Sequence, residues 1–191
     1  MKRTIKLSIV ALMMTGMVVA DEITDIMAET TESYKKGDYA QVKDDLTYVL
    51  ELLKQKKGEN LKMILPEAID GWTAEDAKSE SAGSAMLGGG TTISRVYKKE
   101  KSKITISIVT DSPLMQSIGM MLSNPMFSSG GTLKRIKREK AMIKYNKQQN
   151  SGELTVVVDK RFIITIKGKK VLEEELVNYA KAIDFKKLKS M

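Results

Sequence analysis

The chain has 191 residues, a formal net charge of +8, and neither cysteine nor histidine. Without cysteine there are no disulfides and no thiol nucleophile, so a packed core must supply the stability. Without histidine the chain lacks the most common general base and the most common metal ligand. The composition therefore favours binding over catalysis, and we expect neither a cofactor nor a metal.

The first twenty residues have the three parts of a secretory signal peptide. Three basic residues open the chain, and the apolar stretch 7–19 is shorter than the roughly 20 residues of a membrane-spanning helix. Small residues then predict cleavage after Ala20. We expect residues 1–20 to be removed, leaving a soluble periplasmic protein of formal charge +5 that is not a lipoprotein, because it has no cysteine to modify.

Residues 21–66 have the pattern of a helical hairpin. Apolar residues recur at helical spacing up to Gly37, where the first helix is expected to end. Asp38 then caps a second helix, with Gln41 three residues later as in a capping box. That second helix is predicted to end at Gly58, because glycine commonly follows the last helical turn.

The turn of this hairpin resembles one tetratricopeptide repeat. The matching residues are Tyr34-Lys35-Lys36-Gly37-Asp38-Tyr39, followed by Val42 and Leu46. Val42 stands where that family usually has alanine, and no second copy follows in the sequence. Because stacked repeats need about three units to bury a continuous core, the resemblance implies a lone hairpin and not a peptide-binding superhelix.

Residues 67–191 are predicted to form an α+β sandwich domain with an antiparallel sheet of about six strands. The strands are expected at 92–98, 103–110, 132–137, 140–145, 153–158 and 161–167. A helix from Pro113 to about Ser123, with Ser112 as its N-cap, follows the second strand, and a last helix follows the sixth. The last helix is expected to bury Leu172, Leu176, Tyr179, Ala180 and Ile183. The order β-β-α-β-β-β-β-α is typical of hairpin-linked strands covered by helices on one apolar face.

Two resemblances extend over this domain. The layout is similar to the Mog1/PsbP-like sandwiches at the level of the fold, which implies no function. The sequence from Leu65 onward also resembles an uncharacterised family of proteobacterial secreted proteins. The residues that carry this second resemblance are Gly71-Trp72-Thr73-Ala74-Glu75-Asp76-Ala77, Val109-Thr110-Asp111-Ser112-Pro113-Leu114, Ser123-Asn124-Pro125 and Ala182-Ile183-Asp184-Phe185. It implies a periplasmic address, and it supplies no functional residue.

Three motifs invite a catalytic or phosphate-binding interpretation. Ser33-Tyr34-Lys35-Lys36 spells S-x-x-K, but the companion S-D-N and K-T-G elements of penicillin-binding enzymes are absent. The acidic groups Asp44-Asp45 and Glu173-Glu174-Glu175 are expected on solvated helix surfaces, the latter in a first helical turn. Gly88-Gly89-Gly90 lacks the Gly-Lys-Ser/Thr of a phosphate loop and leads into a strand. A Ser-Lys hydrolase is therefore the weakest of the alternatives.

Residues 114–127 contain four of the nine methionines that follow the signal peptide. Clustered thioethers can bind Cu(I), but Met115 and Met121 belong to the core-facing stripe of the predicted helix, and the two thioethers that remain make a poor copper site. Met120 and Met126 are left without a core role. Because methionine-rich surfaces adapt to varied partners, Met120, Met126 and Phe127 are the candidate contacts for a ligand or partner. Packing of this segment into the core is the alternative.

The basic run 133–140 falls in a predicted hairpin, where its charges divide between two faces and a turn. Lysine on such strands also discourages edge-to-edge aggregation. The pattern indicates a solvated strand with its turn at Arg138-Glu139 more than an anion site.

Two hypotheses about function stand ahead of the Ser-Lys hydrolase. The leading one is a non-enzymatic periplasmic protein that binds a protein or another envelope component, without nucleic acid and with at most weak peripheral membrane contact. The alternative is a carrier of a lipid or other hydrophobic ligand, held between the sheet and the methionine-rich helix. An internal apolar cavity would favour the carrier, and a solid core with exposed apolar surface would favour the binding protein.

Overall fold

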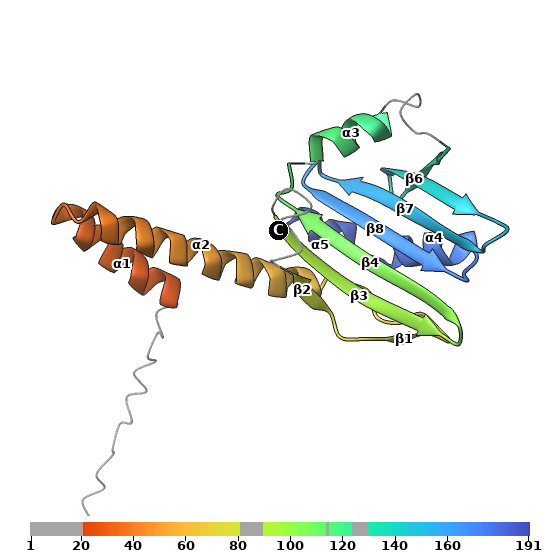
Figure 1. Ribbon diagram of the computed structural model, residues 1–191, viewed down its shortest axis with the longest axis horizontal. Coiled ribbons are helices and arrows are strands. Elements are labelled where there is room, and N and C mark those ends of the chain that lie inside the picture. Colours follow the sequence, from red (N-terminus) through yellow and green to blue (C-terminus); the bar gives the residue numbers. More distant parts are fainter. Residues whose placement is uncertain (1–20, 81–89, 114, 124–129) are drawn as a thin grey trace, which may run out of the picture. The chain divides into compact units, whose positions relative to one another are not determined.

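The computed structural model describes residues 21–80, 90–113, 115–123 and 130–191 (Figure 1). Contacts within the chain divide it into two compact units, one up to Leu52 and one over residues 53–191, and each is described by itself. The predicted signal peptide and its cleavage site after Ala20 lie outside the described residues. None of the helices in the described ranges is both long enough and apolar enough to cross a bilayer.

The predicted helical hairpin is confirmed. Helix α1 spans Glu22–Lys35 and helix α2 spans Tyr39–Lys62. Gly37 separates them with a φ of +77°, a left-handed conformation that glycine adopts without steric penalty. Asp38 caps α2 as expected, because its Oδ1 accepts the Gln41 backbone N–H at 3.1 Å.

Helix α2 does not end at Gly58, so that prediction is wrong. The helix continues to Lys62, and Gly58 is buried. A Cβ atom at Gly58 would lie 2.7 Å from Oγ of Ser79, in the short strand β2 (Lys78–Glu80). The glycine therefore permits a close approach between helix and strand and does not mark a helix end.

The second unit contains an antiparallel sheet, and its α+β class is confirmed. Besides β2, the strands are β1 (Thr73–Ala74), β3 (Thr91–Lys99), β4 (Ser102–Thr110), β5 (Thr132–Ile136), β6 (Glu139–Asn146), β7 (Ser151–Val158) and β8 (Phe162–Lys169). The order is β1-β3-β4-β8-β7-β6-β5, and β2 also pairs with β3. All six predicted strands are present as β3 to β8. The described sheet has eight strands and not six. The sequence did not predict β1 and β2, because strands of two and three residues are too short to show an apolar period.

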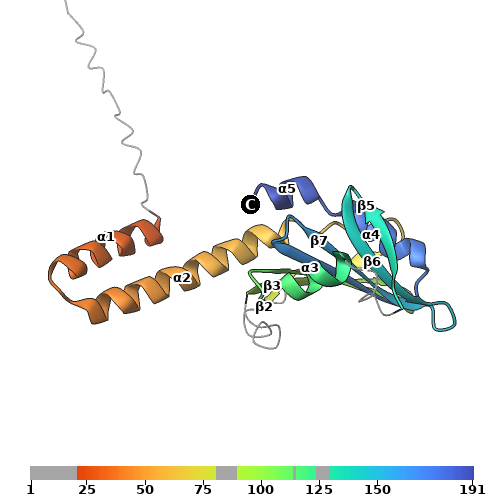
Figure 2. The same ribbon diagram turned by 90° about the horizontal axis from the view of Figure 1, so that it is seen from above.

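Helices α4 (Glu173–Ala182) and α5 (Phe185–Lys189) lie on one face of this sheet (Figures 1 and 2). The core beneath α4 is closely filled. Its fully buried side chains include Ile104, Ile106, Ile108, Leu154, Phe162 and Ile164.

The predicted apolar face of the last helix is correct except for one member. Leu176, Tyr179, Ala180 and Ile183 are buried, whereas Leu172 is 62% exposed. Leu172 is the N-cap residue of α4 and has extended backbone angles, so its side chain does not join the helical stripe.

Asp184 caps α5 and supplies a pH-dependent contribution to stability. Its Oδ1 accepts the backbone N–H groups of Lys186 and Lys187, both at 3.0 Å. These bonds, the one from Lys187 most strongly, hold the pKa of Asp184 below its ordinary value of 3.8. Because the folded pKa is depressed, the stabilisation is present above pH 3.8 and is lost as the pH falls through the folded value.

We therefore expect the melting temperature of Asp184→Asn, which keeps an acceptor but no charge, to fall below that of the parent protein at pH 5. This difference should shrink as the pH falls below 3.8 and Asp184 becomes protonated. Thermal unfolding followed by circular dichroism between pH 2 and pH 5 measures it. A difference that stays constant with pH would show that the charge of Asp184 contributes nothing.

Candidate functional site

Helix α3 (Met115–Ser123) lies on the side of the sheet away from α4 and α5 (Figures 1 and 2). Its first residue donates a backbone N–H to the carbonyl of Ser112 at 3.0 Å. Side chains alternate between faces along a strand, and Val156 and Val158 are buried in the core. Val157 of β7 therefore points to the face on which α3 lies.

A groove of about 1130 Å³, open on one side, lies beside α3 at the end of the sheet that carries the β5–β6 and β7–β8 turns. Its apolar lining is Met115, Met120 and Val157, and its charged lining is Arg138, Glu139, Lys140, Asp159, Lys160 and Lys189. Met120 is 57% exposed. The groove thus combines a methionine-rich floor with a rim that carries more positive than negative charge.

Of the three residues that the sequence predicts as contacts, Met120 is the one in the described ranges, and it lines this groove. Met126 and Phe127 lie outside the described residues. The role of all three as contacts stays a prediction.

Two hairpin turns place cations on the rim. The turn from β5 to β6 is Lys137-Arg138, one residue earlier than predicted, with φ values of +46° and +74°. The turn from β7 to β8 has Asp159 and Lys160 at its centre, as predicted, with φ values of +54° and +50°. Turns with two left-handed residues favour Asn-Gly or Asp-Gly, so Arg138 and Lys160 stand where glycine is preferred. Left-handed backbone at a non-glycine residue costs roughly 1 kcal/mol.

The ion pairs around the groove leave three of its cations unmatched. Glu139 pairs with Lys189 at 2.5 Å, and Asp159 pairs with Arg161 at 3.6 Å. Arg138, Lys140 and Lys160 are exposed, and none of them forms an ion pair within the part of the chain that the structure describes. These three side chains are referred to below as the cationic rim. The rim is able to attract and hold an anionic group beside the apolar floor.

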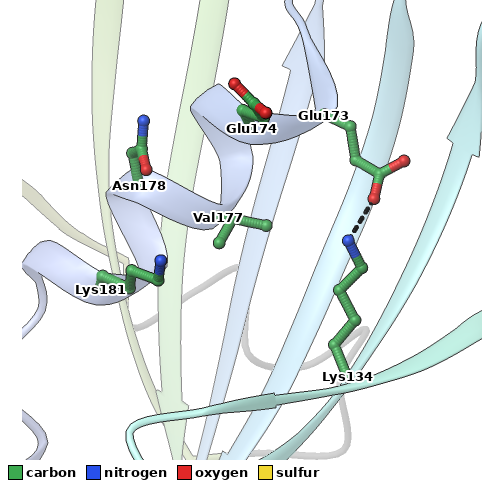
Figure 3. A pocket seen from close by; sticks show the side chains of 6 residues that line it. All are labelled: Lys134, Glu173, Glu174, Val177, Asn178 and Lys181. Atoms are coloured by element: carbon green, nitrogen blue, oxygen red, sulfur yellow. Dashed lines mark hydrogen bonds and ion pairs between the residues drawn. The ribbon is translucent and has the colours of Figure 1, made fainter.

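A second hollow lies between α4 and β5, and its chemistry is different (Figure 3). Its volume is about 580 Å³, and Lys134 bridges it through an ion pair to Glu173 at 2.5 Å. Glu174 and Lys181 also line it, so its positive and negative charges balance. With Val177 as its apolar side chain, this hollow offers neither a net charge nor an apolar floor to a ligand.

None of the motifs typical of catalysis contributes a residue to the described lining of the groove. Ser33 and Lys36 sit at the end of α1, and Lys36 is exposed, so this pair provides no desolvated lysine to activate a serine. Asp45 accepts a hydrogen bond from Gln41 at 2.7 Å on the surface of α2. Within the described ranges, no cluster of three or more carboxylates is placed to hold a metal ion.

Comparisons with known proteins do not assign this chain to a family. No protein-family model matches the sequence, and no curated protein matches it. Among solved structures, a GTP-binding regulator from Thermotoga maritima is similar over 64% of this chain and 83% of its own, with 10% identity and a TM-score of 0.41. Nothing is carried over from that protein to this chain.

Sequence reasoning identified Met120 but missed the cationic rim. The basic run 133–140 was interpreted as a solvated strand, and its lysine and arginine side chains are indeed exposed. Lys160 lies twenty residues further along the chain and reaches the same rim through the pairing of β6 with β7. Because two-residue turns point both tips to one end of the sheet, the predicted hairpins themselves were the available signal.

Proposed function

We propose that this protein is a non-enzymatic periplasmic binding protein, and that its groove beside α3 binds an anionic lipid of the cell envelope. The observation that carries the proposal is the cationic rim around a methionine-rich floor. The lipid's anionic headgroup would lie on Arg138, Lys140 and Lys160, and the start of its acyl chains would contact Met115 and Met120. Cations and apolar side chains in one exposed surface are the combination that binds peripheral proteins to anionic bilayers.

The turn backbones support a binding role for the rim. Glycine at Arg138 or Lys160 would relieve left-handed backbone, so both cations persist at a cost in stability. Backbone strain held at a surface commonly serves the site to which it belongs. Arg138 and Lys160 are exposed and do not pack in the core, whereas binding of an anion would account for a cation at each position.

Surface binding fits the structure better than storage of a whole lipid. The groove is open along one side, whereas a carrier encloses most of its ligand's surface. The described core between the sheet and α4 is filled by buried side chains such as Tyr97, Phe162 and Leu154. We therefore favour contact with a bilayer surface over the carrier alternative.

The test is flotation of the chain lacking residues 1–20 with vesicles of phosphatidylcholine alone or mixed with phosphatidylglycerol. We expect binding to the anionic vesicles and not to the neutral ones, with a marked loss at high salt. Lys140→Glu should weaken binding at least tenfold, since each cation at an anionic surface contributes about 1 kcal/mol and reversal counts twice. Lys101→Glu is the matched control, because Lys101 is exposed in the β3–β4 turn and does not line the groove.

Arg138→Gly separates binding from folding. We expect this variant to be at least as stable as the parent protein, because glycine relieves the φ of +74°, and yet to bind anionic vesicles about fivefold more weakly. Denaturant unfolding and vesicle flotation measure the two quantities on one sample. Misfolding cannot explain a loss of binding in a protein that has become harder to unfold.

Two results would contradict the lipid proposal. Equal binding to neutral and anionic vesicles would show that the cationic rim does not select the ligand. Failure to bind either vesicle, together with saturable binding of an acidic peptide that Lys140→Glu removes, would assign the groove to an acidic protein segment.

A further inference from the structure

The helical hairpin leaves many of its large apolar side chains exposed. Over residues 22–52, Thr30 and Val49 are the buried side chains of the described hairpin. Large apolar side chains of both helices are exposed by 41% or more. They are Met27, Tyr34, Tyr39, Leu46, Tyr48 and Leu50. Exposed apolar surface of this extent marks a protein interface, and tyrosine is among the residues that contribute most at such interfaces.

The first compact unit, which holds most of the hairpin, is strongly acidic, whereas the second, which holds the sandwich and the end of α2, is strongly basic. Residues 21–52 contain nine Asp and Glu against three lysines, a formal charge of −6. Residues 53–191 contain 26 Lys and Arg against 15 Asp and Glu, a formal charge of +11. A partner for the hairpin must therefore offer apolar surface and positive charge together.

A second copy of this chain could offer the hairpin either its own hairpin or its α3 groove, and charge favours the groove. Pairing of two hairpins from separate copies would bring together two surfaces of charge −6, which repel each other. The groove beside α3 offers the opposite charge through Arg138, Lys140 and Lys160, together with the apolar floor at Met115 and Met120. Within the described part of the chain, this groove offers the hairpin both positive charge and apolar surface.

We propose that the acidic hairpin of one molecule docks into the α3 groove of a second copy. Such a contact joins two different surfaces, so it is heterologous and propagates into chains or rings. Because it depends on charges near the surface, it is weak at physiological salt and strengthens at low salt. The hairpin and an anionic lipid would then compete for one groove, although the self-association does not depend on the lipid proposal.

The test uses sedimentation velocity of the chain lacking residues 1–20, from about 5 to 500 µM. We expect the weight-average mass to rise with concentration in about 20 mM salt and to return to that of a monomer in about 0.5 M salt. Leu50→Asp on the hairpin and Lys140→Glu on the rim should each abolish the rise. Met63→Asp and Lys101→Glu are the matched controls outside both surfaces, and they should associate like the parent protein.

Mixing the two inactive variants tests the head-to-tail geometry. Leu50→Asp retains an intact groove and Lys140→Glu retains an intact hairpin, so an equimolar mixture should form a 1:1 dimer and nothing larger. A mixture that stays monomeric overturns the proposal, provided that circular dichroism shows both variants to be folded. Self-association that survives Lys140→Glu also overturns it, because the contact would then not use the groove.

The same variants distinguish this inference from the proposed lipid binding. Leu50→Asp should bind anionic vesicles like the parent protein while failing to self-associate. A parent protein that is monomeric at every concentration and still binds anionic vesicles would support the lipid proposal and overturn the docking of the hairpin. Self-association without vesicle binding would support the docking of the hairpin and overturn the lipid proposal.

Discussion

Replacement of Tyr179 by alanine is expected to lower the free energy of unfolding by about 3–5 kcal/mol, the usual range for removing a large aromatic side chain from a core. Tyr179 is 1% exposed on the inner face of α4. Its ring meets Trp72 edge to face at a centroid distance of 5.6 Å and Tyr97 at 4.6 Å. Alanine would leave a cavity in the centre of this aromatic cluster, which the surrounding strands cannot close.

Guanidinium chloride unfolding followed by the fluorescence of Trp72, the single tryptophan of the chain, measures this loss directly. Tyr179→Phe is the control, because the Tyr179 hydroxyl is buried and makes no hydrogen bond in the described structure. Removing a buried, unpaired hydroxyl should change stability by no more than about 1 kcal/mol. If the phenylalanine variant were as unstable as the alanine variant, the hydroxyl and not the ring would be the stabilising group.

The hydroxyl also gives this pair of variants a pH signature. Burial raises the pKa of Tyr179 from 10.0 to about 12, so the folded state favours the neutral phenol. A raised folded pKa means that the stabilisation is complete below pH 10 and is lost as the pH rises through about 12. Relative to Tyr179→Phe, the parent protein should therefore lose stability between pH 10 and pH 12, which denaturation at fixed alkaline pH values can measure.

The strand with the strongest signal in the sequence, predicted at 103–110, is one whose burial alternates with a period of two. Ile104, Ile106 and Ile108 alternate with polar residues, and all three are fully buried beneath α4. Strands β1 and β2 could not be found in this way, because two or three residues show no period. Their existence depends on tertiary pairing with β3, such as Thr73 opposite Lys98.

The sequence predicted only part of the groove, because its apolar lining and its cationic rim arise in different ways. Met120 was identified since it lies outside the apolar stripe of its own helix, which is a local property. The cationic rim is not local: Arg138 and Lys160 meet because β5–β6 and β7–β8 turn at one end of the sheet. Their left-handed backbone follows from strand register, which no composition reveals.

The opposite charges of the hairpin and the sandwich, by contrast, can be counted directly from the sequence. Counting charge by predicted domain gives −3 for residues 21–66 and +8 for residues 67–191. Dividing the chain between Leu52 and Leu53, where its two compact units meet, increases the contrast to −6 and +11. An asymmetry of this size between two parts of a chain is itself a prediction about association. The structure adds where the apolar surfaces lie, and with them which faces would meet.

Replacement of Arg95 by alanine is expected to lower the free energy of unfolding by about 2–4 kcal/mol. The guanidinium joins β3 to the segment that follows α2: Nε donates to the carbonyl of Glu75 at 2.8 Å, and an Nη donates to the carbonyl of Pro66 at 3.1 Å. Hydrogen bonds from a charged donor contribute about 1.5–3 kcal/mol each. The arginine side chain is 16% exposed, so water would replace these donors poorly.

The same guanidinium forms an ion pair with Glu67 at 3.1 Å, and this contact should matter far less. Glu67 is 87% exposed, and solvated ion pairs contribute about 0–1 kcal/mol. We therefore expect Glu67→Ala to be nearly neutral and Arg95→Lys to fall between the two, since an ammonium group cannot span both carbonyls as the planar fork does. Urea unfolding of the three variants measures the order. Equal losses for Arg95→Ala and Glu67→Ala would show that the ion pair, and not the carbonyl contacts, fastens this segment to the sheet.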